Sequence, residues 1–186
     1  KGRHLNDIWG LTTIGIAKTQ EEMDAHLAKV DQSSLGTNWG AGDIMYADLD
    51  GDGKISNGTN KLGDTGDYRI IGNSTPRFKY GITLDAAWKG FDFSIFMQGI
   101  GKRDLWLDGC YFWGANGQGN EWQSTGFTEH WDFFRPEGDP LGANLDAYYP
   151  RVNFSGGRNT QVQTRYLQNG AYLRLKNVQL GYTLPR

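Results

Sequence analysis

Apolar and polar side chains alternate along the stretch from Phe78 to Gly99. The alternation is interrupted only at Lys89–Gly90, after which it resumes in a new phase. The apolar positions are Phe78, Tyr80, Ile82, Leu84, Ala86 and Trp88 before the interruption, and Phe91, Phe93, Ile95 and Met97 after it. A period of two puts alternate side chains on opposite faces of a strand. The pattern therefore predicts a β-hairpin that turns at Lys89–Gly90 and has one apolar face and one polar face.

Each arm of this hairpin is about ten residues long, which is the length that a tilted strand needs to cross a bilayer. Trp88 and Phe91 stand on either side of the turn, as aromatic residues do at a membrane interface. The same alternation also occurs in hairpins of soluble β-sandwiches. The pattern alone therefore leaves two all-β architectures open, a transmembrane β-barrel and a soluble sandwich.

A second alternating segment spans residues 171–184. Leu173 and Leu175 share one phase of the alternation, whereas the later apolar positions share the other. These later positions are Val178, Leu180, Tyr182 and Leu184. A one-residue bulge near Lys176–Asn177 would bring all of them to one face. The polar face of this strand would then carry Arg174, Gln179 and Thr183.

One short loop helix is expected near the start of the chain. Thr19 followed three residues later by Glu22 is a capping-box pattern. The apolar residues that follow at helical spacing are Met23, Leu27 and Val30. The sequence therefore predicts an amphipathic helix over about residues 20–30.

Residues 108–161 show no sustained period, so they are expected to form a long loop. An irregular loop of this length is uncommon in a compact soluble domain. Long loops are typical of the extracellular side of membrane barrels, whereas the periplasmic turns are short. This stretch therefore favours the barrel over the sandwich.

The composition removes several classes of protein. A net charge of -2 over 186 residues, with no basic run, argues against nucleic-acid binding. A mean hydropathy of -0.60 excludes spanning helices but not barrel strands, whose alternation averages out as polar. The 27 glycines and many aromatic residues suit strands, tight turns and wide loops. No signal peptide opens the chain and both ends look cut, so we expect a segment of a larger protein.

We expect no enzymatic activity. The three histidines, His4, His26 and His130, lack metal-binding spacing, and no nucleophile elbow is present. Cys110 is the only cysteine and has no motif partner, so it is expected to be a small buried apolar residue. A glycosidase pair among the many carboxylates is a weaker alternative than solvated loop acids.

The sharpest chemical motif is the acidic stretch from Asp48 to Ser56, which has the spacing D-x-D-x-D-G. Its carboxylates belong to Asp48, Asp50 and Asp52, and Gly53 permits the sharp turn at the sixth position. The carbonyl of Lys54 and the hydroxyl of Ser56 would fill positions seven and nine of a calcium loop. Hard oxygen ligands in this number favour Ca²⁺ over transition metals.

This loop departs from the usual pattern at position twelve, where Thr59 replaces a bidentate Glu. Asp64 or Asp67 could take the place of that ligand after a small insertion, and we choose Asp67 for the metal site. The alternative is an aspartate-rich turn without metal. A structural Ca²⁺ is the preferred expectation.

Stretches in every part of the chain except residues 105–160 carry a family resemblance. They are Asn6-Asp7-Ile8-Trp9-Gly10 with Gln20-Glu21-Glu22, Gly42-Asp43-Ile44 with Asp48 to Gly53, Ile70-Ile71-Gly72-Asn73 with Pro76-Arg77, Tyr80-Gly81 to Gln98-Gly99, and Tyr172 to Gly181-Tyr182. In this order and spacing they resemble the SusC/RagA family of TonB-dependent outer-membrane transporters, the glycan and peptide importers of Bacteroidetes-type bacteria.

The resemblance implies a 22-stranded antiparallel transmembrane β-barrel with an N-terminal plug, embedded in outer-membrane lipid of a Gram-negative cell. It also implies a SusD-like surface lipoprotein as lid, and energy delivered through TonB–ExbB–ExbD. Residues 1–186 would then be a single segment of late barrel strands, without the plug or the final strands. On this interpretation its function is to form part of an importer of glycans or peptides.

Three tryptophans, Trp106, Trp113 and Trp122, are candidate substrate contacts, because an indole face suits the C–H surface of a sugar ring. They could equally pack the loop itself or contact the lid protein. The competing function is a soluble calcium-dependent carbohydrate-binding β-sandwich, which would explain the alternation, the acidic loop and the tryptophans. It does not explain the irregular stretch of about fifty residues.

Overall fold

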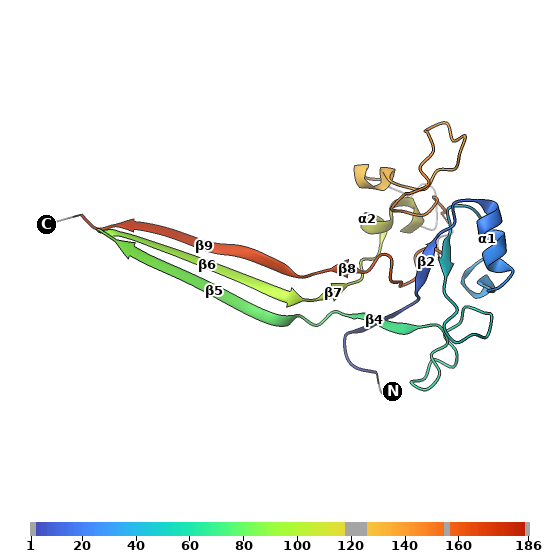
Figure 1. Cartoon of the computed structure of the whole chain (residues 1–186), viewed down its shortest axis with the longest axis horizontal. Coiled ribbons are helices and arrows are strands. Elements are labelled where there is room, and N and C mark those ends of the chain that lie inside the picture. Colours follow the sequence, from blue (N-terminus) through green and yellow to red (C-terminus); the bar gives the residue numbers. More distant parts are fainter. Residues whose placement is uncertain (1–2, 118–125, 155–156, 185–186) are drawn as a thin grey trace. The chain divides into compact units, whose positions relative to one another are not determined.

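The computed structural model describes residues 3–117, 126–154 and 157–184 (Figure 1). The chain divides into two compact units. We call Gly72–Leu105 with Gln168–Arg186 the sheet unit, and Lys1–Ile71 with Trp106–Leu167 the loop unit. No helix among the described residues is both long enough and apolar enough to cross a membrane.

The sheet unit is built on three long antiparallel strands, β5 (Arg77–Trp88), β6 (Phe91–Lys102) and β9 (Tyr172–Tyr182), in the order β5-β6-β9. They run side by side in Figure 1. The two short strands β7 (Asp104–Leu105) and β8 (Gln168–Asn169) pair with each other. The predicted hairpin is therefore confirmed, with Trp88 opposite Phe91.

The turn of this hairpin has the backbone that the sequence requires. Lys89 and Gly90 both have positive φ, 47° and 85°. Two-residue hairpin turns favour this conformation, because its twist matches that of the flanking strands. Gly90 adopts it without steric cost.

The register of the sheet places the apolar positions together. Ile82 pairs with Met97 and Leu84 with Ile95, and Ile95 in turn pairs with Val178. These apolar side chains share one face because directly paired residues of a sheet lie on the same side. Several of them are exposed, with 54% of Leu84 and 74% of Leu180 accessible to solvent.

The predicted bulge in β9 is also present. Phe96 pairs with Asn177, but the next residue, Met97, pairs with Leu175, so Lys176 is the extra residue. An extra residue of this kind restores the side-chain phase after it has slipped by one. Leu173 and Leu175 consequently join the later apolar side chains on one face.

At one position of the sheet, Gly99, a neighbouring aromatic ring leaves no space for a side chain. A Cβ at Gly99 would lie 2.5 Å from both Cζ and Oη of Tyr80, the residue opposite it. The Tyr80 ring therefore lies across Gly99 and covers the space that a side chain would fill. Any larger residue at position 99 would displace this ring.

The loop unit contains short elements joined by long irregular segments. They are β1 (Asp7–Gly10), β2 (Thr13–Ile16), α1 (Gln20–Leu27), η1 (Ser33–Leu35), β3 (Ile44–Tyr46), α2 (Cys110–Trp113), η2 (Gly114–Gly117) and η4 (Thr128–Trp131). Strand β2 pairs with β3, and β1 pairs with β4 (Arg69–Asn73). The core of this unit is strongly aromatic, with Tyr46, Trp113, Phe134, Tyr149 and Tyr166 among its buried side chains.

The predicted helix is present as α1 but ends at Leu27, before the expected Val30. Thr19 caps it as predicted, because its hydroxyl accepts the amide of Glu22 at 3.2 Å. The last apolar position, Val30, comes directly after the turn that follows the helix, and it packs against the core. The expectation of a single loop helix was wrong, since α2 also forms, although its four residues are too few to show a helical period.

The loop unit is tied together around the fully buried carboxylate of Asp43. Arg151 binds this carboxylate in a bidentate manner, with Nε donating to Oδ1 at 2.8 Å and Nη2 donating to Oδ2 at 2.6 Å. The amide of Asn159 also donates to Oδ1 at 2.8 Å, and the Gly40 backbone amide donates to Oδ2 at 3.0 Å. The Asp43 charge is thus both paired and hydrogen-bonded.

The same network continues into neighbouring backbone. The side-chain oxygen of Asn159 accepts the amide of Ile44 at 3.0 Å, and the Tyr46 hydroxyl donates to the carbonyl of Arg158 at 2.7 Å. Arg158 in turn donates to the carbonyls of Thr37 and Asn38. Segments more than one hundred residues apart in the sequence are therefore held side by side by polar contacts.

We predict that Asp43→Ala will open this network. The loss leaves Arg151 without its carboxylate. Breaking a buried ion pair costs about 3–5 kcal/mol, and we expect about 2–3 kcal/mol here because solvent screens the partly exposed Arg151. The measurement is amide hydrogen exchange of residues 36–46 in the full-length protein. Asp146→Ala, which breaks the exposed Lys18–Asp146 pair, is the matched control and should leave this exchange unchanged. Equal effects of the two variants would contradict the prediction.

Candidate metal-binding loop and aromatic pocket

The structure brings three carboxylates of the acidic loop together. Oxygen atoms of Asp48, Asp50 and Asp67 lie within 4.8 Å of one another. Asp67 is fully buried, whereas Asp50 is exposed. The sequence analysis named Asp48 and Asp50 from their spacing, and it named Asp67, with Asp64 as the alternative, as the replacement for the missing ligand at position twelve.

Backbone amides hold two of these carboxylates in position. Asp48 accepts the amides of Gly51 and Gly53, at 2.7 and 2.8 Å. Asp67 accepts the amides of Leu49 and Ser56, also at 2.7 and 2.8 Å. Asp67 therefore joins the two ends of the acidic loop, although it lies eleven residues beyond Ser56.

The electrostatics of the loop favour a cation. The hydrogen bond from the Gly53 amide, together with further amide bonds, holds the pKa of Asp48 below its ordinary value. The pKa of Asp50 is raised: a hydrogen bond from the Asp52 amide lowers it, but loss of solvent and the charges of neighbouring aspartates outweigh that bond. Across the part of the chain that the structure describes, no Lys, Arg or His nitrogen lies within 4.0 Å of the three carboxylates. A set of oxygen donors with excess negative charge fits a hard divalent cation.

Asp52, which was predicted from the same spacing, lies outside this group of three carboxylates. Asp52 accepts the amide of Lys54 at 2.8 Å, and the Ser56 hydroxyl accepts the amide of Gly58 at 3.1 Å. Asp64, the alternative to Asp67, instead accepts the amide of Thr59 at 3.0 Å. The backbone of Lys54 forms an isolated bridge with Asp31.

The predicted tryptophans are placed in different environments. Trp113 is 2% exposed and packs against Trp106 and Tyr166, with ring centroids 5.9 and 4.7 Å away. Trp106 is partly buried against the same core. Trp122 lies outside the described residues. The structure therefore brings two of the three together, with the Trp113 ring inside the core.

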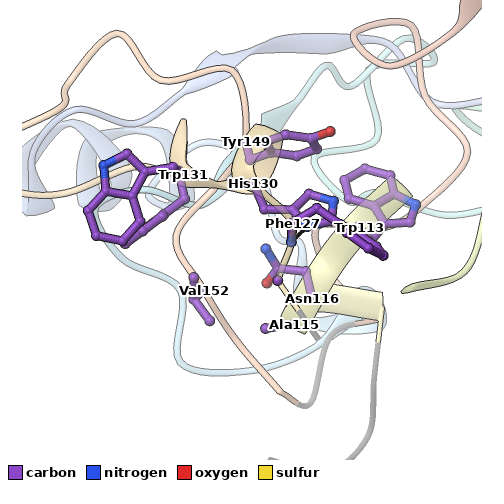
Figure 2. A pocket seen from close by; sticks show the side chains of 10 residues that line it. Trp113, Ala115, Asn116, Phe127, His130, Trp131, Tyr149 and Val152 are labelled. Carbon is purple, nitrogen blue, oxygen red and sulfur yellow. Dashed lines mark hydrogen bonds between the residues drawn. The ribbon is translucent and has the colours of Figure 1, made fainter. Parts of the chain in front are cut away.

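Next to this core lies a pocket of about 320 Å³, which the sequence analysis missed. Its aromatic walls come from Trp113, Phe127, Trp131, Phe133 and Tyr149, with Asn116, His130 and Val152 among the other lining residues (Figure 2). These residues come from α2, η2, η4 and the segments before and after η4. The density of aromatic residues between 111 and 149 was a signal for it, but no periodic pattern marks which of them converge.

Three polar atoms of the pocket are engaged by the protein, whereas the buried Nε1 of Trp113 has no hydrogen-bond partner among the described residues. The backbone amide of Phe127 donates to Nδ1 of His130 at 3.0 Å, and Nε2 of the same ring lies 3.1 Å from the carbonyl of Phe112. Because Nδ1 accepts, the hydrogen of the neutral ring is assigned to Nε2. The side-chain oxygen of Asn116 accepts the amide of Asn153 at 2.8 Å. The pocket therefore offers mainly aromatic surface.

Comparison with known proteins gives relatives along most of the chain. The chain is 33% identical over 145 residues to TonB-dependent receptor P3 of Formosa agariphila, a match that covers 77% of this chain and 12% of the relative. This chain is similar to a segment of TonB-dependent receptors. TonB-dependent receptor P26 of the same organism is 28% identical over 179 residues, which are 95% of this chain and 15% of that relative. No protein-family model matches.

Both TonB-dependent receptors are much longer than the matched region. The chain spans only about an eighth of the first of these curated relatives and a slightly larger part of the second. The similarity to TonB-dependent receptors covers the acidic loop and the sheet in the longer match, since it extends over nearly the whole chain.

Proposed function

We propose that this chain forms wall strands and outer loops of a TonB-dependent receptor of the SusC/RagA type in a Gram-negative outer membrane. The single observation that carries the proposal is the exposed apolar face of β5-β6-β9, in a chain whose relatives are named TonB-dependent receptors. Lipid would cover this face in the membrane. The polar face would line the lumen.

The dimensions of the strands support this proposal. A strand of 12 residues, such as β5 or β6, is about 40 Å long at ~3.3 Å per residue. Tilted by about 45°, it spans about 28 Å, close to the ~30 Å hydrocarbon core. The tight Lys89–Gly90 turn would face the periplasm, and the long connection between β6 and β9 would leave the barrel on the outer side.

The alternative, a soluble calcium-dependent carbohydrate-binding sandwich, is less well supported. A sandwich buries the apolar face of each sheet against a second sheet about 10 Å away. In the described residues, the sheets other than β5-β6-β9 have only two short strands each. The long exposed apolar face fits lipid better than it fits such a partner.

The proposed receptor imports glycans or peptides. A SusD-like surface lipoprotein would close over the outer loops, and TonB–ExbB–ExbD would deliver energy through parts of the protein outside this chain. We propose no role for nucleic acid, because the net charge is -2 and no basic run is present. The chain acts in transport and not in catalysis.

Fractionation of native cells tests the location. An antibody against residues 108–160 should detect a detergent-soluble outer-membrane band much larger than 20.8 kDa, whose mobility changes on boiling as expected for a stable barrel. A soluble band near 20.8 kDa would overturn the proposal and favour the sandwich.

A matched pair of arginine substitutions tests the orientation of the sheet. Ile82→Arg would put a charge into hydrocarbon, which costs about 2–4 kcal/mol near the bilayer midplane. Thr83→Arg, one residue away on the polar face, should cost much less because its charge would enter the lumen. The measurement is the urea-dependent folding equilibrium of the full-length protein in lipid vesicles. A larger loss for Thr83→Arg than for Ile82→Arg would reverse the assigned faces.

We further propose that the acidic loop holds a structural Ca²⁺. The supporting observation is the convergence of Asp48, Asp50 and Asp67 without a cationic side chain nearby in the described residues. Asp52, the Lys54 carbonyl and Ser56 are additional ligands in this proposal, consistent with the D-x-D-x-D-G spacing. The ion would neutralise carboxylates that otherwise repel one another.

We expect Asp50→Ala to lower calcium affinity at least tenfold, because it removes the exposed carboxylate of the group. Asp64→Ala is the matched control, since it removes an acid of the same loop that bonds to Thr59 instead. Both variants of the full-length protein are titrated with Ca²⁺ by calorimetry. Calcium binding that is unchanged in Asp50→Ala, or lost equally in both variants, would remove this site from the proposal.

A further inference from the structure

We infer that the aromatic pocket of the loop unit binds an apolar aromatic ring of the size of an aromatic amino-acid side chain. This inference goes beyond the proposed function. All residues that line the pocket belong to the loop unit, and binding of a ligand to them can be measured on purified protein whether or not the protein transports anything.

The size of the pocket fits such a group. A cavity of about 150 Å³ with apolar walls is enough to hold benzene. The pocket here is about 320 Å³, at the lower end of the range for small-molecule sites. It therefore has room for a two-ring side chain such as an indole together with part of its backbone.

The walls of the pocket suit the faces and edges of a ring. Trp131 and Phe133 meet edge to face, with centroids 6.1 Å apart and planes at 89°. The ring of His130 packs similarly against Tyr149, at 5.4 Å and 75°. A ring entering between such walls gains both apolar burial and favourable edge-to-face contacts.

These walls are fixed before a ligand arrives. Arg135 donates from Nη1 to the carbonyl of Trp131 at 2.9 Å and from Nε to the carbonyl of Gly142 at 2.7 Å. Its guanidinium lies 4.9 Å from the ring centroid of Phe133 and 5.6 Å from that of Trp131. One side chain thus fixes two aromatic walls, which lowers the entropy that binding would otherwise cost.

The polar groups of the pocket argue for an apolar ring and against a sugar. Both ring nitrogens of His130 are engaged by backbone groups, and the Asn116 oxygen already accepts a hydrogen bond. A sugar carries a hydroxyl on nearly every ring carbon, and a buried hydroxyl without a partner is unfavourable. A phenyl ring has no polar group to satisfy, and an indole has only one N–H donor.

The test measures binding of N-acetyl-L-tryptophanamide to the purified full-length protein by equilibrium dialysis. Val152→Trp should fill the pocket from one wall, and this position is 43% exposed, so the fold has room for the change. Leu141→Trp is the matched control, because Leu141 is 57% exposed and does not line the pocket. We expect saturable binding that weakens at least tenfold in Val152→Trp and changes less than twofold in Leu141→Trp.

A second variant and two further ligands make the outcome decisive. Trp131→Ala removes an exposed wall and should weaken binding at least fivefold, and N-acetyl-L-alaninamide, which lacks the ring, should not bind. Unchanged affinity in both Val152→Trp and Trp131→Ala would overturn the inference. So would tighter binding of methyl β-D-glucopyranoside with the same sensitivity to Val152→Trp, which would make the pocket a sugar site. None of these results depends on the cell fraction that contains the protein.

Discussion

The buried charge of Asp43 is the constraint on which the loop unit depends. A carboxylate that leaves water must be paired and hydrogen-bonded within the protein. Arg151 and Asn159 meet this requirement, although both lie more than one hundred residues away in the sequence. These contacts hold the segment that contains Arg151 and Asn159 next to the start of β3. The aromatic core of the loop unit includes residues from both of these segments.

Both candidate sites begin next to this ion pair. Strand β3 starts at Ile44, directly after Asp43, and the acidic loop begins at Asp48, two residues beyond the end of that strand. On the other side of the pair, Tyr149 and Val152 flank Arg151 and line the aromatic pocket. The acidic loop and the aromatic pocket therefore each include residues that lie within a few positions of this ion pair in the sequence.

Local patterns allowed the sheet to be predicted closely. A period of two is a property of neighbouring residues, so the hairpin, its turn and the faces of its strands could be read directly. Even the bulge at Lys176 followed, because two leucines out of phase with the later apolar residues require one extra residue between them. In the acidic loop, spacing identified Asp48 and Asp50. The choice of Asp67 over Asp64 depended on how residues 57–66 fold, which spacing does not encode.

The aromatic pocket could not be predicted for the same reason. Trp113 meets Tyr166 across more than fifty residues, and no periodic signal connects them. The sequence therefore singled out tryptophans by residue type, whereas in the structure the Trp113 ring belongs to the core and also forms one wall of the pocket, and the exposed Trp131 ring forms another. Trp131 was missed because its place in the pocket depends on Arg135 and on the backbone pairing of Phe134 with Tyr149.

The bulge at Lys176 also limits how the length of β9 can change during evolution. Removing one residue elsewhere in the strand would turn every side chain beyond that point to the opposite face, whereas removing two would preserve the faces. Lys176 is different, because the strand already carries one unmatched residue there. Removing Lys176 itself would leave every pairing and every face unchanged, because Leu175 and Asn177 already pair with the consecutive residues Met97 and Phe96 of β6. A change of one residue therefore preserves the faces of β9 only at the bulge, whereas elsewhere in the strand only changes by even numbers do so.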